Sequence, residues 1–152
     1  MELSALYAIN PIPPGKIAFI GSGPLPLSSL CLSHALSNGH AAHKQTQTQL
    51  ITVLNIDNNP QAISQSSALV KSLGTKAKGM QFLCREAGTS PLNLKAFDIV
   101  YLAALVGMTQ EEKERVLIHV VRGMRVSTLL VIRTAHGLRS LLYPVCFTFW
   151  KG

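Results

Sequence analysis

The chain has 152 residues, of which 47% are hydrophobic and 14% are charged, and its formal net charge is +7 at pH 7. This length suits one domain, and the hydrophobic content is that of a folded core and not of a disordered chain. The Lys and Arg residues are scattered without interleaved aromatic residues, so we expect no nucleic-acid partner.

The first predicted element is a buried strand over residues 16–20, because a strand covered by helices on both faces can be continuously apolar. Gly21 and Gly23 follow, and glycines leave room for a ligand against the backbone. Pro24 suits the first turn of a helix that we expect over residues 25–37. The buried face predicted for this helix is Leu27, Leu30, Cys31 and Ala35.

The middle of the chain predicts a second strand and a second helix. Residues 40–49 are polar and of low complexity, which indicates a surface insertion. Residues 50–56 predict a strand with Asp57 at its carboxyl end. The Asn59-Pro60 pair supplies a cap and a first residue for a helix that Gly74 closes. The buried positions predicted for this helix are Ile63, Val70 and Leu73.

Three further strands and one capped helix complete the predicted elements. Residues 80–84 predict a third strand and residues 96–104 a fourth. Thr109 and Glu112 have the spacing of a capping box at the start of a helix, and residues 127–132 predict a fifth strand. The buried stripe predicted for this helix is Val116, Leu117, Val120, Val121 and Met124.

Strands and helices alternate along the chain, which predicts an α/β fold with a doubly wound, mostly parallel sheet. Such sheets bind ligands at the carboxyl ends of their strands, beside the point where the strand order reverses. The candidate positions there are the turn at residues 21–23, Asp57, Glu86, residues 103–108 and residues 133–136.

The two acidic candidates have one functional and one structural interpretation each. Asp57 lies where nucleoside-binding sheets place a carboxylate that accepts both ribose hydroxyl protons, or it is a helix N-terminal acid beside Asn59. Glu86 accepts a bond from an adenine amino group, or it is an exposed loop acid paired with Arg85. The glycine turn alone is also compatible with a structural turn that binds no ligand.

Arg133 and His136 follow a buried strand directly, where loops carry function. Arg133 can bind a substrate carboxylate through two parallel bonds, and His136 can move a proton or orient a neighbour. The alternative is that both are satisfied loop residues. Asp98 lies at the opposite end of its strand, so we expect it to be structural.

Cys31, Cys84 and Cys146 are odd in number, far apart and in apolar contexts. We interpret them as reduced core cysteines of a cytoplasmic protein, without the spacing of metal ligands. The chain shows no signal peptide and no apolar run of membrane-spanning length, so we expect neither a membrane nor a bound metal.

Three stretches stand out together: AFIGSGPLPL at residues 18–27, FDIVYLAALVGM at residues 97–108, and RTAHG at residues 133–137 followed by LYPV at residues 142–145. Together they resemble the nicotianamine synthase family, over residues 16–145 and in the same order. The first stretch is shared by many methyltransferase-like sheets, whereas the other two are much more specific.

The resemblance implies a Rossmann-like sheet of the S-adenosylmethionine-dependent methyltransferase type. It also implies a transferase that joins aminocarboxypropyl groups from S-adenosylmethionine into the metal chelator nicotianamine, releases methylthioadenosine and serves metal homeostasis. The S-adenosylmethionine-binding residues that it implies are Gly21, Ser22, Gly23, Pro24, Asp57, Glu86, Ala103 and Ala104. Arg133 and His136 are assigned to the substrate on their chemistry alone, and no catalytic residue or oligomeric state is assigned.

The predicted organisation is a tether over residues 1–15, an S-adenosylmethionine-binding domain over residues 16–145 and a divergent tail over residues 146–152. Family members carry a helical domain before this sheet and further strands after it. We therefore expect a truncated core whose activity is in doubt. The alternatives are an ordinary S-adenosylmethionine-dependent methyltransferase and an inactive nucleoside-binding fragment.

Overall fold

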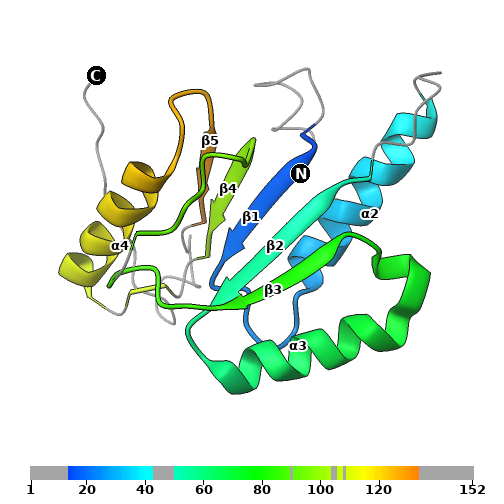
Figure 1. Cartoon of the computed structure of the whole chain (residues 1–152), viewed down its shortest axis with the longest axis horizontal. Helices are drawn as coiled ribbons and strands as arrows, with labels where there is room; N and C mark the ends of the chain where they lie inside the picture. Colours follow the sequence, from blue (N-terminus) through cyan, green and yellow to red (C-terminus); the bar gives the residue numbers. More distant parts are fainter. Residues whose placement is uncertain (1–13, 43–49, 90, 104–105, 108, 134–152) are drawn as a thin grey trace, which may run out of the picture.

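The computed structural model describes residues 14–42, 50–89, 91–103, 106–107 and 109–133. Its centre is a sheet of five parallel strands in the order β3-β2-β1-β4-β5 (Figure 1). The strands are β1 (Lys16–Ile20), β2 (Thr52–Asp57), β3 (Met80–Cys84), β4 (Ile99–Leu102) and β5 (Leu129–Ile132). The predicted parallel sheet is therefore confirmed, and the strand order reverses between β1 and β4.

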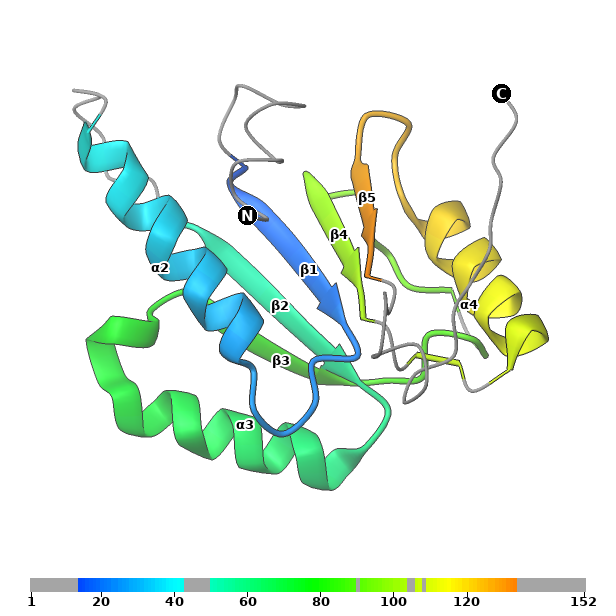
Figure 2. The same ribbon diagram turned by 180° about the vertical axis from the view of Figure 1, so that it is seen from behind.

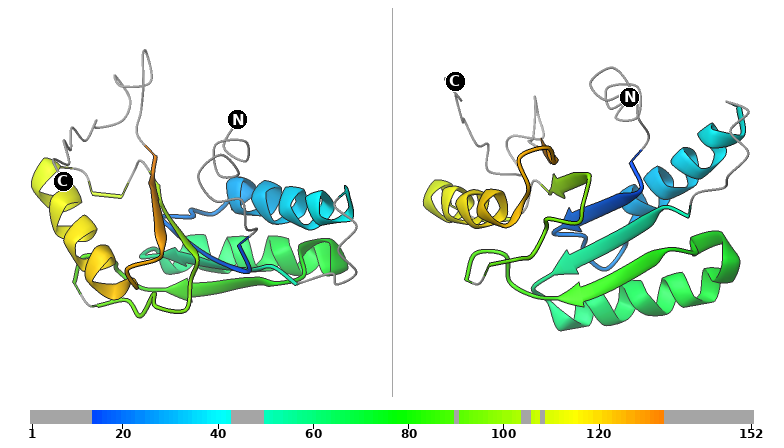
Figure 3. Two further views of the ribbon diagram at one scale, coloured as in Figure 1. Left: turned by 90° about the horizontal axis from the view of Figure 1, so that it is seen from above. Right: turned by 45° about the horizontal axis from the view of Figure 1, so that its top comes forward.

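Helices cover both faces of this sheet, as the continuously apolar β1 predicts. One face carries α2 (Leu27–Ala42), whose Leu32 and Leu36 pack with Ile17 and Phe19 of β1. The opposite face carries α4 (Gln110–Gly123), which packs against Ala18 and other residues of the sheet. Figure 2 shows α2 in front of β2, and Figure 3 shows α2 and α4 on opposite sides.

The caps of the remaining helices agree with the sequence. Helix α3 (Pro60–Leu73) begins at Asn59, whose side-chain oxygen accepts bonds from the backbone of Gln61 (2.9 Å) and Ala62 (3.3 Å). It ends at Gly74, where the short 3₁₀ helix η1 (Gly74–Ala77) begins. The capping box that opens α4 is complete, with Thr109 and Glu112 bonded reciprocally. These local signals are confirmed.

The buried faces of two helices were predicted wrongly. In α2 the buried residues are Ser29, Leu32, Ser33 and Leu36, while Leu27 and Cys31 are exposed. The apolar pattern misleads because two small serines on the inner face let the helix approach the sheet. In α3 the buried residues are Ala62, Ser66 and Val70, so of the three predicted positions only Val70 is buried.

Several boundaries and one interpretation also need correction. Helix α2 runs on to Ala42, because a glycine inside a helix costs only about 1 kcal/mol and does not have to end it. Strands β4 and β5 are shorter than predicted. Of α4's predicted stripe, Val116 and Val120 are buried but Val121 faces outward. Cys31 and Cys84 are exposed and not part of the core, because α2 presents a different face and β3 is an edge strand.

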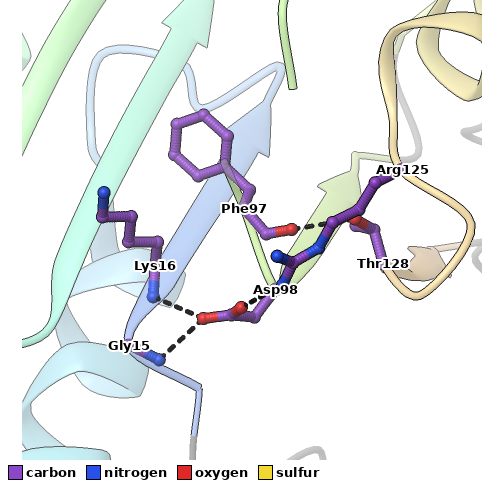
Figure 4. Close-up of polar contacts among 6 residues, drawn as sticks. All are labelled: Gly15, Lys16, Phe97, Asp98, Arg125 and Thr128. Carbon is purple, nitrogen blue, oxygen red and sulfur yellow. Dashed lines mark hydrogen bonds and ion pairs between the residues drawn. The ribbon is translucent and has the colours of Figure 1, made fainter. Parts of the chain in front are cut away.

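Asp98 joins three segments at the amino-terminal end of the sheet (Figure 4). One carboxylate oxygen accepts bonds from the backbone of Gly15 (2.9 Å) and Lys16 (3.0 Å). The other accepts a bond from Arg125 Nη2 (2.6 Å). The structural role expected for Asp98 is confirmed. Within the part of the chain that the structure describes, no helix is both long and apolar enough to cross a membrane.

Candidate functional site

The turn after β1 closes over the end of β2. The backbone N–H groups of Gly21 and Ser22 both donate to the carbonyl oxygen of Ile56, at 2.8 and 3.3 Å. Gly21 and Gly23 have φ angles of 79° and 66°, in the left-handed region that favours glycine. The two glycines therefore determine the shape of this turn.

The two glycines nevertheless face different surroundings. A Cβ atom on Gly21 would lie 2.3 Å from Val106 Cγ2 and 3.1 Å from Ala103 Cβ. A Cβ atom on Gly23 would meet no atom within 4 Å. Gly21 therefore lets the turn pack against the segment after β4, whereas Gly23 borders open space through which a ligand can reach the backbone.

Asp57 connects this turn with the turn after β2. Its Oδ2 accepts a bond from Gly23 N (2.8 Å), and its Oδ1 accepts one from Asn59 N (2.9 Å). The local role beside Asn59 is thus confirmed, and the contact with Gly23 adds a second one. A carboxylate has about four acceptor positions, so the half-buried Asp57 still has capacity for ribose hydroxyl groups.

A buried polar network that the sequence reasoning missed fixes the start of α2. The Ser29 hydroxyl donates to Asn55 Oδ1 (2.7 Å) and lies 2.9 Å from the carbonyl oxygen of Pro26. Asn55 Nδ2 donates to the carbonyl oxygen of Gln81 (3.2 Å), and Asn55 is fully buried. An asparagine within an otherwise apolar strand was the available signal, because a buried amide needs partners.

Ser22, between the two glycines of the turn after β1, carries a buried hydroxyl. Its Oγ has no hydrogen-bond partner among the residues that the structure describes. Pro24 is exposed beside it, and both belong to the turn as predicted. An unsatisfied buried hydroxyl beside open space is consistent with a turn that binds a ligand.

The opposite end of the site is cationic. Arg133 continues β5, donating its backbone N–H to the carbonyl oxygen of Leu102 (2.9 Å). Its Nη1 donates to Ser28 Oγ in the first turn of α2 (2.9 Å), so the side chain crosses the carboxyl edge of the sheet. Arg133 also lines a small recess at this edge, together with Leu102, Ala103, Val106, Lys113, Leu117 and Ile132.

The other predicted site residues are less closely connected. Glu86 is exposed just beyond the end of β3, and it forms no ion pair with the neighbouring Arg85. Ala103 is half-buried beside the glycine turn, whereas Ala104 and His136 lie outside the described residues. No group of three His, Cys, Asp or Glu residues in the described ranges is placed to hold a metal ion.

The family model and the curated relatives agree on one family. The family model described as "Nicotianamine synthase protein" matches residues 1–148. The chain is 39% identical to nicotianamine synthase 3 of Arabidopsis thaliana over 137 residues, which are 90% of this chain and 39% of that protein. It is 41% identical to the nicotianamine synthase of Solanum lycopersicum over 132 residues, 87% of this chain and 38% of that protein.

Solved structures show the same fold. A mutant of MtNAS in complex with S-adenosylmethionine matches with a TM-score of 0.69 at 24% identity, over 96% of this chain and 49% of that one. MtNAS in complex with MTA and tNA matches with a TM-score of 0.68, also at 24% identity, over 96% of this chain and 48% of that one. The chain thus spans about two fifths of these curated relatives and about half of these solved chains.

Proposed function

Because the chain belongs to the nicotianamine synthase family, we propose that its carboxyl-edge site binds S-adenosylmethionine as the substrate of nicotianamine synthesis. In the proposed reaction an acceptor amine attacks the aminocarboxypropyl carbon next to the sulfonium. The carbon–sulfur bond breaks, its electron pair returns to sulfur, and neutral methylthioadenosine leaves. The amine then loses a proton. The product is a metal chelator, which places the activity in metal homeostasis.

The observation that carries the proposal is the turn at Gly23. It offers open space against the backbone at the point where the strand order reverses, and Asp57 accepts a hydrogen bond from its Gly23 N–H. Parallel sheets of this kind bind nucleosides at that point. The residues present therefore fit the nucleoside part of S-adenosylmethionine, with Asp57 accepting from the ribose hydroxyl groups.

The charge distribution fits the rest of the molecule. S-Adenosylmethionine carries a ribose diol on one side of its sulfur and an amino acid carboxylate on the other. The site has its acid, Asp57, at the end of β2 and its cation, Arg133, at the end of β5, with the glycine turn between them. We assign Arg133 to the carboxylate, and Glu86 to the adenine amino group.

The transfer needs no metal ion in the proposed mechanism, because a sulfonium is already a good leaving group. His136 stays a candidate for substrate contact on its chemistry alone. We also place the protein in the cytoplasm, since Cys31 and Cys84 are exposed free thiols of the kind that a reducing compartment preserves.

Calorimetry with S-adenosylmethionine and methylthioadenosine tests the binding step, and we expect both ligands to bind. Mass spectrometry of products then separates two reactions. Methylthioadenosine with nicotianamine supports the proposal, whereas S-adenosylhomocysteine identifies a methyltransferase. Absence of binding by either ligand refutes the proposed site.

A further inference from the structure

Cations that are scattered along the sequence come together at one end of the folded chain. The five strands are parallel, so their amino ends form one edge of the sheet, and both α3 and α4 end near this edge (Figure 1). We call this region, with the last turns of the two helices, the basic edge. It carries seven exposed cations, which are Lys16, Lys71, Lys76, Lys78, Lys95, Arg122 and Arg125.

Acidic residues are distributed the opposite way. Of the six acidic residues that the structure describes, only Asp98 lies on the basic edge, where it is bonded to Arg125 and to two backbone N–H groups. The side chain of Lys16 points away from Asp98 (Figure 4). The other five lie at the carboxyl ends of strands or in the first half of α4, and they are Asp57, Glu86, Glu111, Glu112 and Glu114. The basic edge therefore keeps a strongly positive charge.

Backbone hydrogen bonds join the segments that carry these cations. The carbonyl oxygen of Gly79, directly after Lys78, accepts a bond from β2 (3.0 Å). The carbonyl oxygen of the residue before Lys16 accepts another bond from β2 (3.0 Å). The residue before Lys95 donates to the end of α4, beside Arg122 (2.9 Å). The cations thus belong to neighbouring segments along one edge and not to separate parts of the surface.

Some of these cations also have a local explanation. Lys71 and Arg122 stand in the last turns of α3 and α4, where a positive charge interacts favourably with the helix dipole. Lys16, Lys78 and Lys95 belong to no α-helix, so the dipole does not account for them. The gathering of cations is therefore more than helix termination.

Exposed aliphatic side chains accompany the cations. Leu50 and Val126 are more than half exposed. Leu50 is close to the segment of Lys78, since a Cβ atom on Gly79 would lie 3.6 Å from Leu50 Cδ1, and Val126 directly follows Arg125. A nucleic acid has no apolar phase for such side chains, and no aromatic residue in the described ranges is exposed for stacking on bases. An anionic bilayer attracts the cations and also accepts the aliphatic groups at its headgroup boundary.

We propose that the basic edge binds the surface of a bilayer that contains anionic lipids. The lysines and arginines contact the headgroups, and Leu50 and Val126 enter the boundary layer. The glycine turn lies at the opposite end of the sheet, so the carboxyl-edge site still faces water in this orientation. The inference revises the expectation of no membrane partner, which treated the cations as scattered, and it is independent of the proposed function.

The test measures cosedimentation of the full chain with vesicles. Vesicles of phosphatidylcholine and phosphatidylserine in equal amounts should bind it at low salt, and vesicles of phosphatidylcholine alone should not. One lysine near an anionic surface is worth about fivefold in affinity, so Lys76→Glu with Lys78→Glu should weaken binding by about 20-fold or more. The matched control is Arg85→Glu with Arg115→Glu, which makes the same charge change at two exposed arginines far from the basic edge. It should weaken binding by less than about threefold.

The contribution of the aliphatic groups separates a membrane from a nucleic acid. Val126→Ser should weaken vesicle binding by about threefold or more, because less apolar surface enters the boundary layer. Tighter binding of the unaltered chain to double-stranded DNA than to the anionic vesicles overturns the proposal. Equal binding to both kinds of vesicle, or equal losses in the two double variants, also overturns it. Circular dichroism checks folding, and Lys76→Gln with Lys78→Gln replaces the glutamate pair if that pair does not fold. All of these outcomes leave the proposed substrate site intact.

Discussion

The different surroundings of the two glycines in the turn predict different costs for one and the same substitution. Alanine at Gly21 or at Gly23 forces a side chain into a left-handed backbone, which costs about 1–2 kcal/mol at either position. Alanine also lowers the conformational entropy of the unfolded chain, which offsets about 0.4–1 kcal/mol of that cost. At Gly21 the new methyl group also meets Val106 Cγ2 at 2.3 Å, and overpacking of this kind costs about 1–3 kcal/mol more. We therefore expect Gly21→Ala to be the more destabilising change by about 1–3 kcal/mol.

Urea unfolding of both variants measures this difference in stability. Calorimetry with methylthioadenosine measures the difference in ligand affinity, which should be the opposite way round. Gly23→Ala should retain most of its stability and lose affinity for methylthioadenosine, because its methyl group enters the open space beside the turn. The control is Gly21→Ala in a Val106→Ala background, where the closest contact is gone and part of the lost stability should return. Equal destabilisation by the two alanines, or no recovery in the double variant, would refute the packing role of Gly21. Unchanged affinity in Gly23→Ala would place the ligand elsewhere.

The remaining predictions concern the residues that support the turn. Asp57→Ala should weaken binding of S-adenosylmethionine by about 1.5–3 kcal/mol in calorimetry, and Asp57→Asn should weaken it less because an amide oxygen can still accept from Gly23. Asn55→Leu should lower the free energy of unfolding by about 1–3 kcal/mol, because it removes the bonds that Asn55 forms with the Ser29 hydroxyl and with the carbonyl oxygen of Gln81. In a double-mutant cycle measured by urea unfolding, Ser29→Ala should cost less in the Asn55→Leu background than alone, and strict additivity would contradict the network. Thr109→Ala should cost about 1 kcal/mol in the same assay, since it removes one half of a complete capping box.

Local chemistry explains which parts of the fold could be predicted from the sequence. Asn59 and Thr109 cap their helices as expected, because a cap depends on side chains within three residues of the helix start. Strand β3 has the predicted bounds. The buried face of α2 could not be read from apolar residues, because Ser29 and Ser33 are on it. Their burial depends on the sheet, and for Ser29 on a partner 26 residues away in the chain.

The same distinction holds for the site. The glycine turn and Asp57 could be anticipated because parallel sheets place such residues at the carboxyl edge, and the structure brings them into direct contact. Asn55 could have been noticed as a polar residue in a buried strand. Lys113 could not, because it stands in the stretch QEEKER, which has the composition of a solvated helix face. Only the position of α4 on the sheet turns this one charge inward.

The contacts of Asp98 at the other end of the sheet also bear on how the chain folds. Its carboxylate accepts bonds from Lys16 and Gly15, which lie 82 and 83 positions before Asp98 in the chain. These bonds can therefore form only after β1 and β4 have met. Pairings between segments so far apart in the sequence form slowly, because bringing them together costs the entropy of all the chain between them. An interaction that forms after the rate-limiting step slows unfolding and leaves the folding rate nearly unchanged. Asp98 should therefore act on the lifetime of the folded chain more than on the speed with which it forms.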